Sequence, residues 1–445
     1  MVSTHDIPEH ERVHRPHDWL PQDHRVHREW LAGVVDQVDK KKVATKDLHP
    51  VLQELKTTVE NDTRLYMLFT AMFEEIPHKK PYNRDPDGRH KQVRDFPHML
   101  AVLNHILTMA PDWNDSSKRV GMVGTPISAV LDWPMGTPSG VAAFLDPQVN
   151  ALLKKVLKVW GQFLTTPESA YVLRRDNASW FSDHGKKQLE ITANAAKTDL
   201  SFEEMFVCDP KHETHGYKSW DDFFTRQFRD GMRPVASPDD DSVIISACES
   251  KPFNVAYDVK ARDRFWAKGQ PYSVLDMLSH DDLAPRFVGG TVFQAFLSAL
   301  SFHRWCAPVS GKIVKAYVVD GTYFAEPLFT AMHPGHESID RGGENEGQGY
   351  LAATATRAII FIEADNKAIG LVAFLGIGMV EVSTCELSVK PGQKVKKGDE
   401  LGMFHFGGST HCVMFEKGVQ VEGFPQLGGS TNVPVRSQLC KVVKA

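Results

Sequence analysis

The first half of the chain carries apolar residues at helical spacing. Apolar side chains recur every three or four positions over residues 65–76 and again over 96–107, which predicts an amphipathic helix in each stretch. Asp146 followed by Pro147 is typical of a helix start, an N-cap before a first-turn proline, and a third apolar stripe follows it. We therefore expect residues 31–200 to fold as a helical domain.

Beyond about residue 240 the pattern changes to short runs of β-branched and aromatic residues separated by glycine and proline. The run AIGLVAFLGIGMV (368–380) is apolar over 13 residues. Because a membrane helix needs about 20 apolar residues, we interpret this run as a pair of buried strands. The predicted fold class is α+β, with a helical N-terminal domain followed by a mainly β domain over residues 201–445. Residues 1–30 are rich in histidine and other polar residues, which predicts a flexible polar tail.

Composition narrows the class of protein. A length of 445 residues with 42% hydrophobic and 24% charged residues is typical of a soluble protein with two domains. The net charge of -5 gives no reason to expect nucleic acid or an anionic membrane as a partner. The six cysteines form no CxxC pair, which argues against a metal site or a disulfide framework and for a reducing compartment. With no signal peptide visible, we expect a cytoplasmic protein.

The tetrapeptide Gly-Gly-Ser-Thr occurs twice near the C-terminus, at 407–410 and 428–431. The first copy lies between two apolar segments, so a strand, a tight turn and a strand would hold Ser409 in place. Two preceding glycines allow a close approach of its hydroxyl to the carbonyl carbon of Gly408. With a base to take the proton, attack converts the peptide bond to an ester, and elimination with hydrolysis leaves a chain that begins with a pyruvoyl group. The second copy has prolines on both sides and is predicted to be a loop.

Seven segments, in order, resemble the phosphatidylserine decarboxylase family, whose members make a pyruvoyl cofactor from an internal serine. An ordered series of matches from residue 219 to residue 410 is far more specific than any single one. The segments are SWDDFFTRQFRDGMRP (219–234), ISACES (245–250), KGQPYSVLDML (268–278), SFHRWCAPVSGKI (301–313), GTYF (321–324), IGMVEVSTCE (377–386) and PGQKVKKGDELGMFHFGGST (391–410).

The helical N-terminal part and FIEADNKAIGL (361–371) are similar to a soluble fungal branch of this family that decarboxylates aromatic amino acids. The resemblance therefore implies decarboxylation of a free L-aromatic amino acid to its amine and CO2, with a covalent pyruvoyl group and without pyridoxal phosphate. Neither a membrane nor a nucleic acid is expected as a partner. The resemblance also implies that self-cleavage produces a β chain and an α chain, and it leaves open whether the protein is a homodimer. The first alternative is a phosphatidylserine decarboxylase that makes phosphatidylethanolamine.

Carried over position by position, the resemblance makes Ser409 the pyruvoyl precursor, within a processing motif that also contains Gly407, Gly408 and Thr410. The bond between Gly408 and Ser409 is then the cleavage site. The implied partners are His303, a candidate general base and proton donor, and Glu249, a carboxylate that would orient it.

Two positions depart from the family pattern, and several roles stay open. Glu249 replaces the usual aspartate, and Cys306 replaces the second histidine of the HRxH motif. A thiol with an ordinary pKa of about 8.5 favours a space-filling role for Cys306 over a basic one. His303 could instead be an ordinary core histidine, although its motif favours catalysis. Glu386 either holds a turn or faces the pocket.

Two further readings come from other classes of protein. PGQKVKKGDELGMF also resembles the hairpin of biotinyl or lipoyl carrier domains, which would make the chain a non-catalytic carrier or interaction module. Such domains present a lysine at a tight turn, and no turn lysine is found here. An unprocessed pseudoenzyme that serves as an interaction protein is the remaining alternative.

Overall fold

The structure is a computed structural model, and its chain divides into two compact units. The first unit contains residues 1–185, 217–220 and 322–348, and the second contains 186–216, 221–321 and 349–445. We describe each unit by itself. The residues that the structure describes are 8, 20–21, 23–41, 47–75, 92–116, 119–176, 179–263, 272–325, 348–381, 384–406, 409–429 and 431–443.

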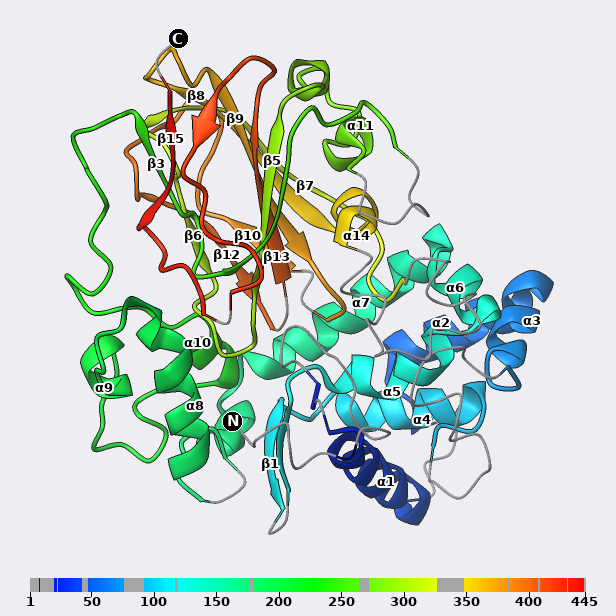
Figure 1. The fold of residues 1–445 in the computed structure, drawn as a ribbon. Coiled ribbons are helices and arrows are strands. Elements are labelled where there is room, and N and C mark those ends of the chain that lie inside the picture. The colour runs from blue at the N-terminus through cyan, green and yellow to red at the C-terminus, as the bar shows by residue number, and fades with distance from the viewer. Residues whose placement is uncertain are drawn as a thin grey trace. The chain divides into compact units, whose positions relative to one another are not determined.

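The described residues of the first unit form helices and one short hairpin, as Figure 1 shows. Most apolar residues of the three predicted stripes are buried, so the predicted helical character is confirmed, although the helix predicted over 65–76 ends at Ala71. The hairpin pairs β1 (Asp112–Ser116) with β2 (Arg119–Val123). The helices are α1 (His24–Lys41), α2 (Pro50–Asn61), α3 (Thr63–Ala71), α4 (Phe96–Ile106), α5 (Pro126–Met135), α6 (Pro138–Phe144) and α7 (Pro147–Leu164).

Local signals in the sequence set the helix starts. The Asp146 side chain accepts hydrogen bonds from the backbone nitrogens of Gln148 and Val149 at 2.8 and 3.1 Å, which confirms the predicted N-cap of α7. Helix α1 begins at His24, inside the stretch that we predicted to be a polar tail. No helix among the described ranges is long and apolar enough to cross a bilayer.

The second unit is built on a seven-stranded antiparallel sheet with the order β11-β7-β8-β9-β13-β5-β4. Figure 1 shows its central strands side by side. The two classes of element, helices in one unit and mainly strands in the other, confirm the α+β prediction. The strands are β4 (Lys251–Ala256), β5 (Thr291–Leu297), β7 (Gly311–Val319), β8 (Arg357–Ala364), β9 (Leu371–Gly378), β11 (Lys394–Val395) and β13 (Ser409–Phe415).

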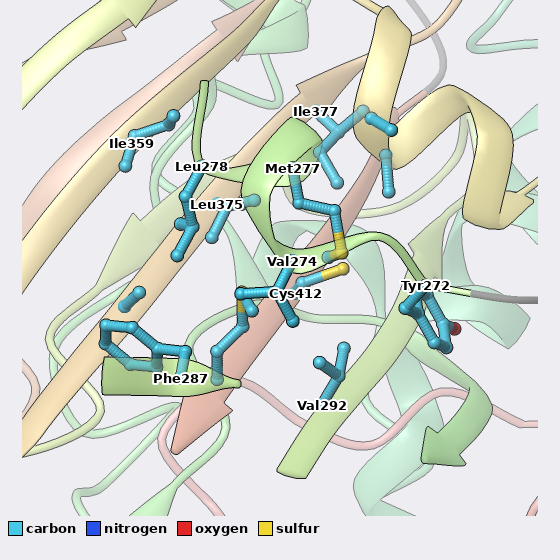
Figure 2. Close-up of a cluster of buried hydrophobic side chains, with 14 of the residues drawn as sticks. Tyr272, Val274, Met277, Leu278, Phe287, Val292, Ile359, Leu375, Ile377 and Cys412 are labelled. Atoms are coloured by element: carbon cyan, nitrogen blue, oxygen red, sulfur yellow. The ribbon is translucent and has the colours of Figure 1, made fainter. Parts of the chain in front are cut away.

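One face of this sheet packs against a large apolar cluster. Helix α11 (Val274–Met277) contributes Val274 and Met277, and strand β13 contributes Cys412 and Met414. Figure 2 shows Cys412 among these side chains. Because side chains alternate along a strand, Ser409 and His411 of β13 point to the opposite face.

Smaller elements complete the second unit. Two three-stranded sheets have the orders β10-β12-β6 and β14-β15-β3. Their strands are β3 (Val243–Ile245), β6 (Arg304–Cys306), β10 (Thr384–Leu387), β12 (Glu400–His405), β14 (Val421–Glu422) and β15 (Gln438–Val442). Further helices are α8 (Asp183–Ala193), α9 (Phe202–Met205), α10 (Trp220–Phe224) and α14 (Gln348–Thr354).

The prediction of a strand pair over residues 368–380 is wrong. A single strand, β9, fills most of this run, and each of its residues is buried. Gly376 and Gly378 lie within the extended strand. A Cβ at Gly376 would lie 2.9 Å from Cζ2 of Trp305, so this glycine makes room for an indole ring.

Candidate active site

Ser409 is the first residue of β13 and is completely buried. It lies in register between Leu297 of β5 and Gly378 of β9, so the sheet fixes its backbone on both sides. Its Oγ makes no hydrogen bond. The strand before it, β12, belongs to a different sheet, so β12 and β13 do not pair with each other as a hairpin.

Phe406, the residue after β12, has an unusual backbone conformation. Phe406 has a φ of 80°, which is costly for a residue with a bulky side chain. Gly407 and Gly408 lie outside the described residues, so the predicted cleavage site remains a prediction. In the second copy of the motif, Gly428, Gly429 and Thr431 lie outside all strands, and Ser430 is not described.

His303 is held near the end of β12. Its carbonyl accepts a hydrogen bond from the backbone nitrogen of Phe404 at 3.0 Å, and its ring stacks on Phe224 with centroids 4.0 Å apart. Burial, together with the positive charge of Arg226, lowers the pKa of His303 well below its ordinary value. The imidazole is therefore neutral at physiological pH. Its role in catalysis remains a prediction.

Glu249 lies in a buried ion pair with Arg233. Nη2 of Arg233 is 2.7 Å from Oε1 and Nε is 3.0 Å from Oε2, and the backbone nitrogen of Val435 donates to Oε2 at 2.8 Å. These bonds occupy both oxygens of the carboxylate, and none of them comes from His303. Whether Glu249 orients His303 during processing remains a prediction.

Cys306 of β6 is buried beside the strand that precedes Glu249. Its backbone nitrogen donates to the carbonyl of Ala247 at 2.9 Å, and its Sγ lies 3.5 Å from the carbonyl of Ser246. Burial raises the pKa of the Cys306 thiol to about 12. The thiol therefore stays protonated near neutral pH, in line with a space-filling side chain.

The structure brings together a histidine and two carboxylates that the sequence analysis did not connect. Nδ1 of His405 lies 2.9 Å from Asp221, and Nε2 lies 3.0 Å from Glu386. Burial lowers the pKa of His405, but the hydrogen bond and charge of Asp221, together with Glu386, more than offset this and raise it. Glu386, whose role was open, thus bonds to His405 at the end of β12, the strand before the predicted cleavage site. Asp221 and His405 lie within the matching segments, but no local pattern indicates that they meet.

A buried polar network lies on the other face of β13, directly after Ser409. Nε2 of Gln294 donates to Oγ1 of Thr410 at 3.1 Å, and the Tyr272 hydroxyl donates to Oε1 of Gln294 at 2.6 Å. The Thr410 hydroxyl donates to the carbonyl of Ala295 at 3.0 Å. These bonds link β13 to β5 and hold the backbone that follows Ser409.

The residues at this position fit a pyruvoyl group. The serine that would become the group has a buried hydroxyl without a hydrogen bond, at the start of a strand paired on both sides. His411, two residues further along β13, is buried, and burial lowers its pKa to about 3. Residue 409 therefore lies in a buried stretch of strand that also carries a neutral imidazole.

Comparison with known proteins identifies the family. Two family models, both described as phosphatidylserine decarboxylase, match residues 49–189 and 220–432. The decarboxylase iboD of Amanita muscaria is 46% identical over 299 residues, which cover 66% of this chain and 84% of that protein.

Less similar relatives are also decarboxylases. The L-tryptophan decarboxylases of Psilocybe cyanescens and Psilocybe cubensis are 36% and 34% identical, over 90% and 91% of this chain and 88% and 89% of their own lengths. Phosphatidylserine decarboxylase proenzyme 3 of Schizosaccharomyces pombe is 29% identical over 52% of this chain and 22% of its own length. Because related decarboxylases align with this chain over most of both lengths, the chain belongs to the phosphatidylserine decarboxylase family and is a decarboxylase, a carboxy-lyase.

Proposed function

We propose that the chain is a self-processing decarboxylase of free L-aromatic amino acids. The observation that carries this proposal is Ser409, a buried serine with a free hydroxyl at the start of a central strand, directly after a glycine pair. The substrate class is supported by the two L-tryptophan decarboxylases, which align over about nine-tenths of this chain, 90% and 91%.

Processing requires only groups of the chain and one water molecule. The Ser409 hydroxyl attacks the carbonyl carbon of Gly408, and its proton passes by way of a base to the departing nitrogen as the C–N bond breaks. Elimination then releases the Gly408 carboxylate, and hydrolysis of the remaining enamine releases ammonia and leaves a pyruvoyl group. His303 is the proposed base because a neutral imidazole can accept a proton.

A pyruvoyl group supplies a ketone that reacts with the substrate amine and takes up the electrons left when CO2 departs. The protein's contribution is the surroundings. The burial of residue 409 beside the neutral imidazole of His411 would leave the substrate carboxylate poorly solvated, which favours its loss as uncharged CO2. His303 is also the proposed relay that takes up a proton from solvent and passes it to Cα of the substrate after CO2 has left.

Intact-mass spectrometry of Ser409→Ala and Ser430→Ala tests the processing step. The unmodified chain and Ser430→Ala should give fragments of residues 1–408 and 409–445, the smaller one reactive toward phenylhydrazine at its N-terminus. Ser409→Ala should remain one strand without a reactive carbonyl. An active preparation that consists of a single uncut chain would refute the proposal.

Phosphatidylserine is the second candidate substrate, since phosphatidylserine decarboxylases are among the relatives, at 29% identity and below. CO2 release from tryptophan, phenylalanine and tyrosine without detergent, compared with release from phosphatidylserine vesicles, separates the two. We expect turnover of at least one aromatic amino acid and none of the lipid. Membership of a decarboxylase family speaks against the non-catalytic carrier reading.

A further inference from the structure

The inference concerns His411, which lies two residues after Ser409 on the same face of β13. Residues at this spacing have Cα atoms roughly 6–7 Å apart along a strand. The side chain is completely buried. In register it lies between two small residues, Ala295 of β5 and Gly376 of β9, so neighbouring strands crowd it little.

Two aromatic rings also lie close to His411. Its ring centroid lies 6.0 Å from the centroids of both Phe293 and Phe374. Burial lowers the pKa of His411 to about 3, an effect that the nearby carbonyl of Ala295 opposes only in part. The ring is therefore a neutral imidazole, with one N–H to donate and one nitrogen to accept.

Neither ring nitrogen of His411 makes a hydrogen bond of acceptable geometry. A buried polar group without a partner is costly, which makes such a group a candidate for ligand binding. Two more unsatisfied atoms lie on the same side of the sheet, Oγ of Ser409 and Nε1 of Trp305. Trp305 lies over Gly376, the direct cross-strand neighbour of His411.

The opposite side of β13 offers no comparable place. There Thr410 is bonded within its polar network, and Cys412 and Met414 are packed into the apolar cluster of Figure 2. A substrate held at residue 409 therefore meets His411 on the face to which both side chains point. The substrate's carboxylate is bonded to the same carbon as its amine, so it comes within reach of a donor two residues along the strand.

We propose that His411 contacts the substrate and donates a hydrogen bond from its imidazole to the substrate carboxylate. This inference rests on the proposed function of Ser409. A neutral donor suits a decarboxylase because it orients the carboxylate without giving it a full countercharge. An arginine in this place would stabilise the carboxylate in the ground state and oppose the loss of CO2.

The test compares His411→Phe, which keeps the ring and loses the donor, with His411→Gln, which keeps an amide donor. Met414→Leu, a volume-conserving change on the opposite face of the strand, is the matched control. Each variant is first assayed for cleavage by intact mass and for its content of phenylhydrazine-reactive carbonyl. Kinetic constants are then measured with whichever amino acid the unmodified chain decarboxylates fastest.

We expect His411→Phe to cleave normally and to raise KM at least tenfold, about 1.4 kcal/mol, while kcat changes less than threefold. His411→Gln should keep KM within about threefold, and Met414→Leu should match the unmodified chain. Inhibition gives a readout independent of turnover. The substrate analogue that lacks the α-amine but keeps the carboxylate should bind His411→Phe at least tenfold more weakly than it binds the unmodified chain. The analogue with an alcohol in place of the carboxylate should bind the two proteins equally.

The inference is overturned if His411→Phe has a KM, and an inhibition constant for the amine-free acid, that are both within twofold of those of the unmodified chain. The proposed function would remain intact in that case. A folded His411→Phe chain that fails to cleave would also overturn it, because His411 would then act in processing. If His411→Phe does not fold, His411→Leu replaces it with the same expectations. An unmodified chain that never cleaves refutes the proposed function and this inference with it, and the first mass spectrum shows that.

Discussion

Nη2 of Arg233 lies 2.7 Å from Oε1 of Glu249, and both side chains are buried. Arg233 also donates to the carbonyl of Ala193 at 2.6 Å, and its guanidinium lies 4.2 Å from the ring centroid of Phe228. The carboxylate implied as the partner of His303 is therefore part of a bonded cluster that joins separate segments of the second unit. This arrangement gives Glu249 a structural role that can be separated from a catalytic one.

Glu249→Gln should destabilise the second unit, because it leaves the Arg233 charge buried without a countercharge. Removing one partner of a buried ion pair costs about 3–5 kcal/mol of stability. We expect a loss near the lower end of this range, because the amide oxygen of glutamine can still accept a hydrogen bond from Arg233. We expect a drop of at least about 5 °C in the thermal midpoint, measured by calorimetry. Glu363→Gln, which breaks the exposed pair with Lys367, is the control and should change little. Unchanged stability with lost cleavage would instead favour a purely catalytic role.

The bonds between His405 and its two carboxylates should make stability depend on pH. The folded-state pKa of His405 is raised above its ordinary value of 6.5. The stabilisation is therefore complete below pH 6.5 and is lost as the pH rises through the raised value. The difference in thermal midpoint between the unmodified chain and His405→Gln should be largest near pH 6 and should shrink toward pH 9. His280→Gln, at a more exposed histidine beside Asp276, should show no comparable trend. A difference in thermal midpoint between the unmodified chain and His405→Gln that stays constant with pH would contradict the prediction.

Tyr272→Phe should weaken the network behind Ser409. Removal of the hydroxyl leaves Oε1 of Gln294 buried without its 2.6 Å hydrogen bond. Loss of one hydrogen bond costs about 0.5–1.5 kcal/mol, so we expect a lower thermal midpoint together with slower cleavage. The time course of fragment formation during expression measures the second effect. Tyr257→Phe, at an exposed tyrosine, is the control. Cleavage at an unchanged rate would mean that the network does not help to position Ser409.

Cys306→Ala should leave the pH profile of kcat/KM unchanged between pH 6 and 9. With a pKa raised to about 12 by burial, the thiol does not titrate in this range. The loss of one buried sulfur should cost about 1 kcal/mol of stability. A fall in kcat/KM of more than tenfold, or the disappearance of a step from the profile, would show that the cysteine has a chemical role.

The sequence predicted elements whose signals are local. Helices α4 and α7 follow from apolar periodicity, and the start of α7 follows from Asp146 and Pro147, because these interactions join residues within one or two turns. The run 368–380 shows the limit of such signals. Its length predicted a pair of strands, whereas the structure forms one strand over most of it and uses Gly376 to admit the indole of Trp305, 71 residues earlier in the chain.

For this protein, the order of residues along the chain determined the α+β class, because that class depends on hydrophobic periodicity. The same order determined the family and the choice of Ser409 over Ser430 as the proposed cleavage point, because these depend on motifs that follow one another in the sequence. Only the tertiary structure decided that Arg233 holds Glu249, that His405 meets Asp221 across 184 residues, and that His411 shares a face with Ser409 amid unsatisfied polar atoms. The physical reason is that strand pairing and burial select partners by position in space. A residue's neighbours in the chain carry almost no information about those partners.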